Sequence, residues 1–158
     1  MHYWRSLMAD STGLLVFIIE DIRLAVDLDQ VDRVVRAASL KPIPGAPSNV
    51  LGLLNLNGIP VPVLSLRQKL KLEEREMETT DEIIILRRQE ALLGLVVDDV
   101  EDVTNNRKIE KLPQAAELKH LKGAFSIEEG IVLLHDIEKF LSSEEELALA
   151  AALASSEV

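Results

Sequence analysis

The sequence predicts an all-β fold of two small five-stranded barrels that pack against each other, with short helices and a C-terminal helix. Three observations predict it. The apolar runs have strand length and are rich in Val, Ile and Leu. Asn57-Gly58, between two such runs, is typical of a two-residue hairpin turn. The whole succession of elements then recurs at an offset of roughly 70 residues, which indicates two copies of one unit.

Composition limits the class of protein. The chain has 158 residues, enough for one domain with a proper core, and only 3% are aromatic, so that core must be aliphatic. The formal net charge of −10 argues against binding to nucleic acid or to an anionic membrane. With no cysteine there is no disulfide or thiolate chemistry. No secretory signal or membrane-spanning window is visible, so we expect a cytoplasmic protein without direct membrane insertion.

The first half reads as hairpin, short helix, strand and hairpin. Residues 14–19 and 22–26 form strands around a turn at Glu20-Asp21, and Asp27 or Asp29 caps a short helical turn. Residues 34–38 return to strand, and the proline-rich residues 40–47 form an extended connection.

Residues 50–66 form the central hairpin, on which the rest of the chain is organised. Pro60 and Pro62 face the same way and cannot donate ladder hydrogen bonds, so that side of the strand should lie at a sheet edge or a bulge. The charged residues 67–80 are interpreted as a solvated loop with a helical turn, in preference to a binding tail.

The second half repeats the first. Residues 83–86 and 91–97 form strands around a turn at 87–90, residues 98–103 read like 28–34, and residues 122–127 and 132–137 read like the central hairpin. We therefore expect an N-terminal arm at 1–12 and one domain at 13–142, with subdomains at about 14–66 and 83–137. A helix follows at 143–158, with Ser143 as N-cap and Glu146 at N3, and its thin apolar stripe should lie loosely on the body.

The sequence contains no catalytic or metal-binding constellation. His2, His120 and His135 are far apart, and His135 is interpreted as a surface or strand-end residue. Asp98-Asp99 with Glu101 and Asp102 would suit a cation, but helix capping and solvation are the favoured explanation. No phosphate-binding glycine loop is present. The residues therefore predict an interaction module that is not an enzyme and has no cofactor or metal.

The central hairpin also carries a family resemblance. Its block Gly-x-x-Asn-Leu-x-Gly-x-x-Val-Pro-Val-x-x-Leu, from Gly52 to Leu66, resembles the signature hairpin of the CheW-like domains. These are adaptors that couple bacterial chemoreceptors to the chemotaxis histidine kinase. Further matches follow in order over residues 14–142: the 14–26 hairpin, Asp29-Gln30-Val31-Asp32, Ile43-Pro44-x-Ala46-Pro47, residues 94–100, Leu121-Lys122-Gly123 and Asp136-Ile137-Glu138-Lys139. The resemblance implies two SH3-like five-stranded β-barrel subdomains around a shared core.

The resemblance also implies a non-catalytic adaptor with two kinds of partner. A groove between the subdomains would take the tip of a methyl-accepting chemoreceptor, and another surface the regulatory domain of the histidine kinase. The adaptor would be cytoplasmic, and recruited to membrane receptor arrays when its receptor is. By position, the receptor groove would include Leu28, Val31, Arg33, Gly52 and Asn57, and the kinase-binding surface Glu82, Gly94 and Val103. The alternative is that the aliphatic residues among them are core and that the glycines meet backbone needs.

Three positions depart from the family's pattern. Asn57 stands where arginine is usual, Arg33 where glutamate is usual, and Ser65 where aspartate is usual. The first two changes look linked, since a Glu–Arg pair would lose both its members. We therefore keep as alternatives a non-motility chemosensory pathway with a divergent receptor, and a small-ligand-binding β protein.

Overall fold

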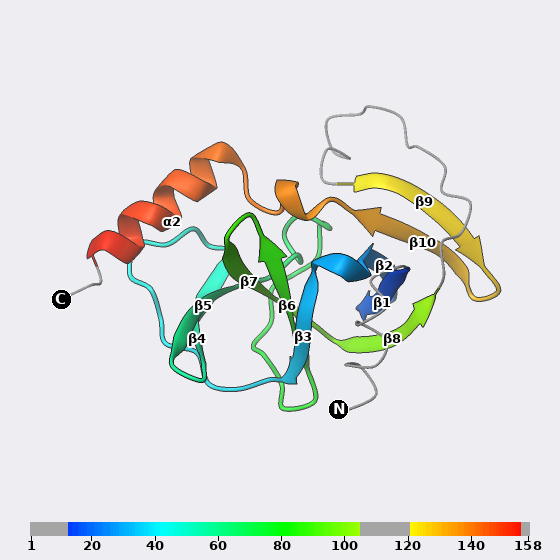
Figure 1. The fold of residues 1–158 in the computed structure, drawn as a ribbon, viewed down its shortest axis with the longest axis horizontal. Helices are drawn as coiled ribbons and strands as arrows, with labels where there is room; N and C mark the ends of the chain where they lie inside the picture. Colours follow the sequence, from blue (N-terminus) through cyan, green and yellow to red (C-terminus); the bar gives the residue numbers. More distant parts are fainter. Residues whose placement is uncertain (1–12, 105–120, 156–158) are drawn as a thin grey trace.

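The computed structural model describes residues 13–104 and 121–155, which form two five-stranded sheets and a C-terminal helix (Figure 1). Predictions about residues 1–12, His2, His120 and the proline link near Lys111 lie outside the described residues. The strands and helices, in chain order, are β1 (Leu14–Ile19), β2 (Ile22–Asp27), η1 (Leu28–Gln30), β3 (Val31–Arg36), β4 (Val50–Leu56), β5 (Ile59–Leu64), β6 (Glu82–Arg88), β7 (Ala91–Val97), β8 (Asp99–Thr104), β9 (Leu121–Ile127), β10 (Gly130–His135), η3 (Ile137–Lys139) and α2 (Ser143–Ser155).

The predicted hairpins are confirmed at their turns. β1 and β2 pair antiparallel from Leu14↔Asp27 to Ile19↔Ile22, around Glu20 and Asp21. β4 and β5 close on Asn57-Gly58, whose φ angles of 51° and 90° are both positive, as a type I′ turn requires. β5 is not an edge strand, but its ladder with β7 includes only Val63 and Leu64, so both prolines lie where β5 pairs with β4 alone.

The two sheets exchange strands between the two halves of the chain. One sheet has the order β8-β1-β2-β10-β9 and the other β3-β6-β7-β5-β4. Each therefore combines a hairpin from one half with three strands from the other. The hairpin is joined to the strands of the other half by one parallel and one antiparallel pair, β2–β10 and β1–β8 in the first sheet and β5–β7 and β3–β6 in the second. The repeat holds for the order of strands, whereas the sheets do not coincide with the expected halves at 14–66 and 83–137.

The apolar side chains form three clusters, which confirms two subdomains around a shared core. Successive β1 residues alternate between them, as the pleat of a strand requires: Leu14 and Val16 lie inside the first sheet, whereas Leu15 and Phe17 lie in the large cluster that joins both sheets. The interior of the second sheet is filled from β4, β5 and β6 by Leu54, Leu56, Val61, Val63, Ile83 and Ile85.

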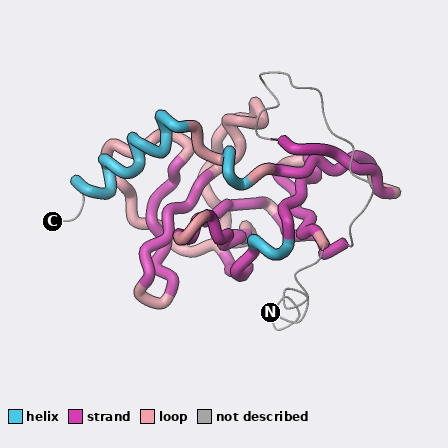
Figure 2. Tube along the Cα trace, turned by 45° about the horizontal axis from the view of Figure 1, so that its top comes forward, coloured by secondary structure: helices cyan, strands magenta, loops and turns pink. Residues whose placement is uncertain are grey.

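The two short helical turns lie in the middle of the molecule, and η1 connects β2 of the first sheet to β3 of the second (Figure 2). Asp27, one of the two residues expected to cap this turn, is the N-cap of η1. Its side chain makes no capping bond, because the carboxylate accepts a hydrogen bond from Lys122 Nζ at 2.5 Å instead. Residues 98–103 do not repeat this helix: Asp98 is a bend and β8 begins at once.

The N-cap of the C-terminal helix lies one residue earlier than predicted. Glu145 N donates to Ser142 Oγ at 3.1 Å, and Ser142 N donates to Glu145 Oε1 at 2.9 Å, so Ser142 and Glu145 form the capping box. Most of its residues are exposed, as expected for loose packing, whereas Leu149 and Ala152 are buried and anchor it to the shared core. Leu147 of the predicted stripe is exposed.

Candidate functional site

The corner formed by η1 and β3 presents charge over an apolar base. Leu28 and Val31, predicted to line a groove, are each 1% exposed and belong to the shared core. The exposed groups here come from Asp29, Arg33 and Arg87. Leu28 and Val31 therefore position this corner from beneath and offer little surface of their own.

Asp32 joins the two arginines of this corner. Arg33 Nε lies 2.7 Å from Asp32 Oδ2, and Arg87 Nη1 lies 3.1 Å from Asp32 Oδ1. Arg87 also donates to the carbonyl oxygens of Asp29 at 2.9 Å and Val31 at 3.3 Å, which satisfies backbone acceptors at the end of η1. Arg33 thus pairs with its own chain neighbour, and its side chain stays 41% exposed.

The strand register brings Arg33, Gly52 and Gly94 into one row across the second sheet. The row runs Gly52↔Val63, Val63↔Gly94, Gly94↔Ile85 and Ile85↔Arg33. Residues expected on two different binding surfaces therefore share one transverse row of the same sheet.

Both glycines of this row meet packing needs. Gly52 has φ +152° at a bulge, and a Cβ there would lie 2.7 Å from the carbonyl oxygen of Lys41, which bridges to Leu53. A Cβ on the buried Gly94 would lie 2.9 Å from Val63 Cγ2. Any contribution of these residues to a partner surface is through the backbone that they shape.

Asn57 is exposed at the tip of the β4–β5 hairpin. The turn is held by Asn55, whose Oδ1 accepts the Gly58 backbone N–H at 2.7 Å. Ile59, next in the chain, is 52% exposed. The tip therefore offers an amide and an apolar side chain to a partner.

The other predicted surface lies where the two sheets meet. Glu82 Oε1 accepts the backbone N–H of Val100 at 3.0 Å, which joins the start of β6 to β8. Val103 lies on β8, an edge strand of its sheet, and pairs with Leu15 of β1. Its side chain is half-buried against the shared core. Glu82 and Val103 are thus linked through β8, whereas Gly94 is interior.

The charged segment after β5 is mostly exposed and has a turn at 67–71, as expected, but two of its arginines anchor it to the body of the molecule. Arg67 is only 5% exposed, and it donates to Glu20 Oε1 at 2.5 Å and to Asp98 Oδ1 at 2.6 Å. Arg75 donates to both oxygens of Asp81 at 2.9 Å. We name Glu20, Arg67, Arg75, Asp81 and Asp98 the charge cluster. Because Glu20 ends β1 while the others flank β5, β6 and β7, the charge cluster fastens one sheet to the other.

Hydrogen bonding outweighs burial in the charge cluster. Burial opposes the charged forms of Arg67 and Asp81, yet hydrogen bonds to Glu20 and Asp98 raise the pKa of Arg67. Bonds from Arg75 and from the Glu78 N–H lower the pKa of Asp81. Hydrogen bonding to Asp81 likewise raises the pKa of Arg75. All three groups are therefore charged at neutral pH.

Asp98 belongs to the charge cluster and caps no helix. Its carboxylate accepts from Arg67, from Arg75 and from the Glu20 backbone N–H at 2.8 Å. Helix capping, which we expected for one of these acidic residues, is wrong, because Asp98 is followed directly by strand β8. Within residues 13–104 and 121–155, no three His, Cys, Asp or Glu side chains are arranged to hold a metal ion.

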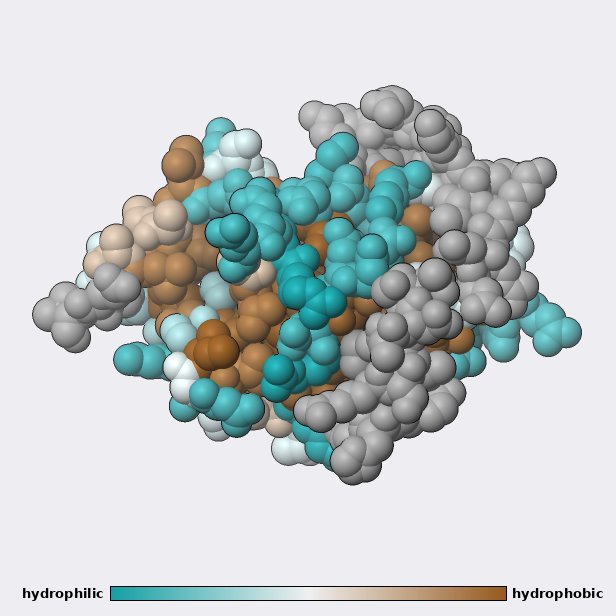
Figure 3. Space-filling view, in the orientation of Figure 1, coloured by the Kyte–Doolittle hydropathy of each residue, from teal (hydrophilic) through white to brown (hydrophobic). Residues whose placement is uncertain are grey.

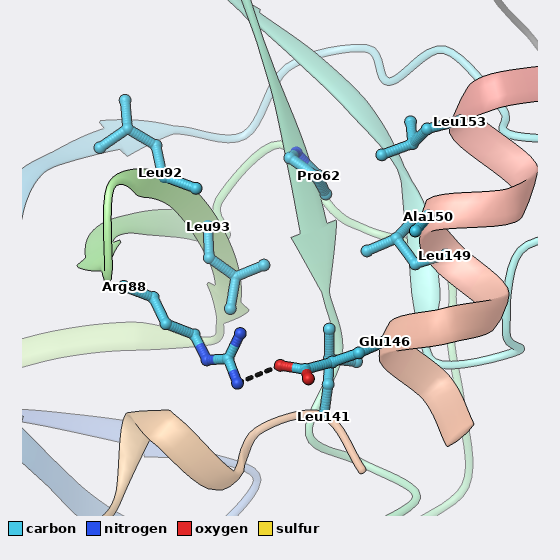
Figure 4. Close-up of a pocket in the computed structure, with 10 residues that line it drawn as sticks. Pro62, Arg88, Leu92, Leu93, Leu141, Glu146, Leu149, Ala150 and Leu153 are labelled. Atoms are coloured by element: carbon cyan, nitrogen blue, oxygen red, sulfur yellow. Dashed lines mark ion pairs between the residues drawn. The ribbon is translucent and has the colours of Figure 1, made fainter. Parts of the chain in front are cut away.

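A pocket of about 250 Å³ lies between α2 and the second sheet (Figure 4). Its walls are mainly apolar, from Pro62, Leu92 and Leu93 on the sheet and Leu149 and Leu153 on the helix. Arg88 and Glu146 form an ion pair at its edge. In the space-filling view, apolar surface gathers over α2 and the second sheet, beside a hydrophilic band across the middle (Figure 3). A ligand-binding function would depend on this pocket.

We expected His135 at the surface or at the end of a strand. It is the last residue of β10, and it is fully buried. Its ring packs edge-on against Phe140 with centroids 5.3 Å apart. This histidine is part of the core.

Comparison with known proteins places this architecture in a family. The family model described as the CheW-like domain matches residues 13–145. The chain belongs to the CheW-like family. It is 30% identical to the chemotaxis protein CheW of Klebsiella aerogenes over 136 residues, which cover 83% of this chain and 82% of that protein. It is 26% identical to the chemotaxis protein CheW of Treponema pallidum, with 92% of each chain covered.

A solved structure shares the fold. The scaffolding protein TtCheW of Thermoanaerobacter tengcongensis superposes with a TM-score of 0.77 at 22% identity, over 85% of this chain and 90% of that one. Membership of the CheW-like family makes this chain a chemotaxis adaptor and scaffold and not an enzyme. Among the described residues, no helix is long and apolar enough to cross a bilayer.

Proposed function

We propose that this CheW-like chain holds a chemoreceptor tip and the regulatory domain of a chemotaxis histidine kinase on two separate surfaces. The observation that carries the proposal is family membership over residues 13–145. Two sheets fastened by a shared core and a charge cluster form a rigid support, which suits a scaffold whose partners must keep a fixed relative position.

The receptor surface comprises Leu28, Val31, Arg33, Gly52 and Asn57. Arg33 and Asn57 supply its exposed polar groups, whereas the buried Leu28, Val31 and Gly52 set the backbone beneath them. A helical tip that rests there would meet the arginines of the η1 corner and the apolar Ile59 of the hairpin. The kinase surface comprises Glu82 and Val103, which lie around the edge strand β8, and Gly94, which is buried and shapes the backbone of β7.

A second candidate is an adaptor in a non-motility chemosensory pathway with a divergent receptor. Arg33 supports it, since the half-exposed guanidinium is paired with Asp32 and would favour an acidic group on the receptor. The general role of the adaptor is the same in both cases, and only the matching receptor differs.

Titration calorimetry with purified full-length chain tests both surfaces. We expect Arg33→Glu to weaken binding of a receptor cytoplasmic fragment by about tenfold, with binding to the kinase regulatory domain unchanged. We expect Val103→Glu to weaken binding to the kinase regulatory domain and to leave binding to the receptor fragment unchanged. Arg36→Glu, on the same strand and exposed, is the matched control for Arg33.

Equal effects of Arg33→Glu and Arg36→Glu on receptor binding would contradict the receptor surface. Loss of both partners in every variant would indicate misfolding, which circular dichroism separates from a binding defect. Failure of Asn57→Arg to change affinity for any receptor tip would count against the divergent receptor.

A further inference from the structure

The tip of the β4–β5 hairpin carries a reactive pair of residues. Asn57-Gly58 is the single Asn-Gly pair in the sequence. In such a pair, the backbone nitrogen of glycine attacks the asparagine side chain, because glycine has no Cβ to hinder the approach. Both residues are exposed, and a Cβ built on Gly58 would meet nothing within 4 Å, so water reaches the turn freely. Exposure alone would make this a site of spontaneous deamidation.

The reaction needs a Gly58 nitrogen that is free. That nitrogen loses its proton and forms a bond to Asn57 Cγ, while the Cγ–Nδ2 bond breaks and ammonia leaves. Water then opens the resulting succinimide at either carbonyl and yields an aspartyl or an isoaspartyl residue at position 57. No oxidant, metal or enzyme is required.

In the folded chain, the Gly58 nitrogen is not free to attack. The Gly58 N–H donates to Asn55 Oδ1 at 2.7 Å, so its proton is engaged by the side chain three residues earlier. Asn57 is held at φ 51° and Gly58 at φ 90° by the ladder pair Leu56↔Ile59 on either side. The attack would require this turn to open and the hydrogen bond to break.

We propose that Asn57-Gly58 is a latent deamidation site and that Asn55 protects it by holding the Gly58 N–H. The protection is local, since it depends on one side-chain hydrogen bond at an exposed turn. Deamidation would add one negative charge at the hairpin tip. Any effect of that charge on receptor binding rests on the proposed function, whereas the rate of deamidation does not.

The test is the rate of deamidation in the full-length folded chain, incubated at pH 7.4 and 37 °C and followed by peptide mass spectrometry with isoaspartate detection. We expect Asn55→Ala to deamidate at position 57 about fivefold faster than the unaltered chain, as loss of one hydrogen bond predicts. Asn55→Asp, which keeps an acceptor oxygen at the same place, should stay slow. The chain unfolded in urea gives the unprotected rate.

Two results would overturn the proposal. One is an equal rate at position 57 in the unaltered chain and in Asn55→Ala; the other is a folded rate equal to the rate in urea. If Asn55→Ala unfolds part of the hairpin, Asn55→Asp decides the matter, because a fast rate in that folded variant would show that the acceptor gives no protection. Asn49, which is not followed by glycine, serves as an internal control in every sample.

Discussion

Arg67 is the residue on which the attachment of the two sheets depends most. Its guanidinium bonds Glu20 from the first sheet and Asp98 from the end of β7, at 5% exposure. Arg67→Met should lower the free energy of unfolding by about 3 kcal/mol, because Glu20 loses its cationic partner and Asp98 keeps only Arg75. Urea denaturation measures this loss.

Arg36→Met is the matched control for this loss. Arg36 is exposed on β3, and a change there should stay within about 0.5 kcal/mol. Similar losses for Arg67→Met and Arg36→Met would show that the charge cluster adds nothing to stability.

The lowered pKa of Asp81 determines the direction in which the free energy of unfolding should change with pH. Since the Arg75 and Glu78 bonds outweigh burial and hold its pKa below the ordinary value, its contribution is complete above pH 5 and is lost as pH falls through the lowered pKa. Asp81→Asn should therefore cost about 2 kcal/mol at pH 7. The gap from the unaltered chain should narrow as pH falls toward 3, in unfolding curves measured at each pH. A gap that is constant from pH 7 to pH 3 would contradict this assignment.

At the scale of elements, α2 offers a test of where a helix begins. Ser142→Ala removes the side-chain oxygen that caps Glu145 N and should destabilise the chain by about 1 kcal/mol. Ser143→Ala, at the first helical residue, should be nearly neutral. Thermal melts of the two variants compare them directly. The opposite order would restore the predicted cap at Ser143.

The elements differ in how far local sequence determines them. The hairpins at Glu20-Asp21 and Asn57-Gly58 were predictable, because turn chemistry and strand alternation act within a few residues. The position of the α2 N-cap was not predictable, because Ser142 and Ser143 each have a glutamate three residues later. Lys69, which pairs with Glu145 at 3.2 Å, favours the earlier box and is distant in sequence.

At the scale of the whole molecule, the repeat predicts the order of strands but not their exchange between the two sheets. Two similar units have similar strands, so local pattern cannot distinguish β3 pairing with β6 from β3 pairing with its own half. The same limit explains the charge cluster. Glu20 and Arg67 are 47 residues apart, and only the packing of the two sheets brings them together.

The candidate site was predictable in part. Resemblance to the family identified positions, but Leu28, Val31 and Gly94 are interior. An aliphatic residue or a glycine carries no sign in the sequence of whether it faces the core or a partner. Arg33 and Asn57 are at the surface, and their polar character indicated it.

The central claim is that this CheW-like chain couples a receptor to a kinase, and reconstituted kinase activity tests it most directly. Autophosphorylation of the chemotaxis histidine kinase would be measured with receptor-containing membranes from the same organism, with and without the purified chain. We expect receptor-dependent control of the kinase rate to require the chain and to be weakened by Arg33→Glu or Val103→Glu. A kinase rate that the receptor controls equally well without the chain would contradict it.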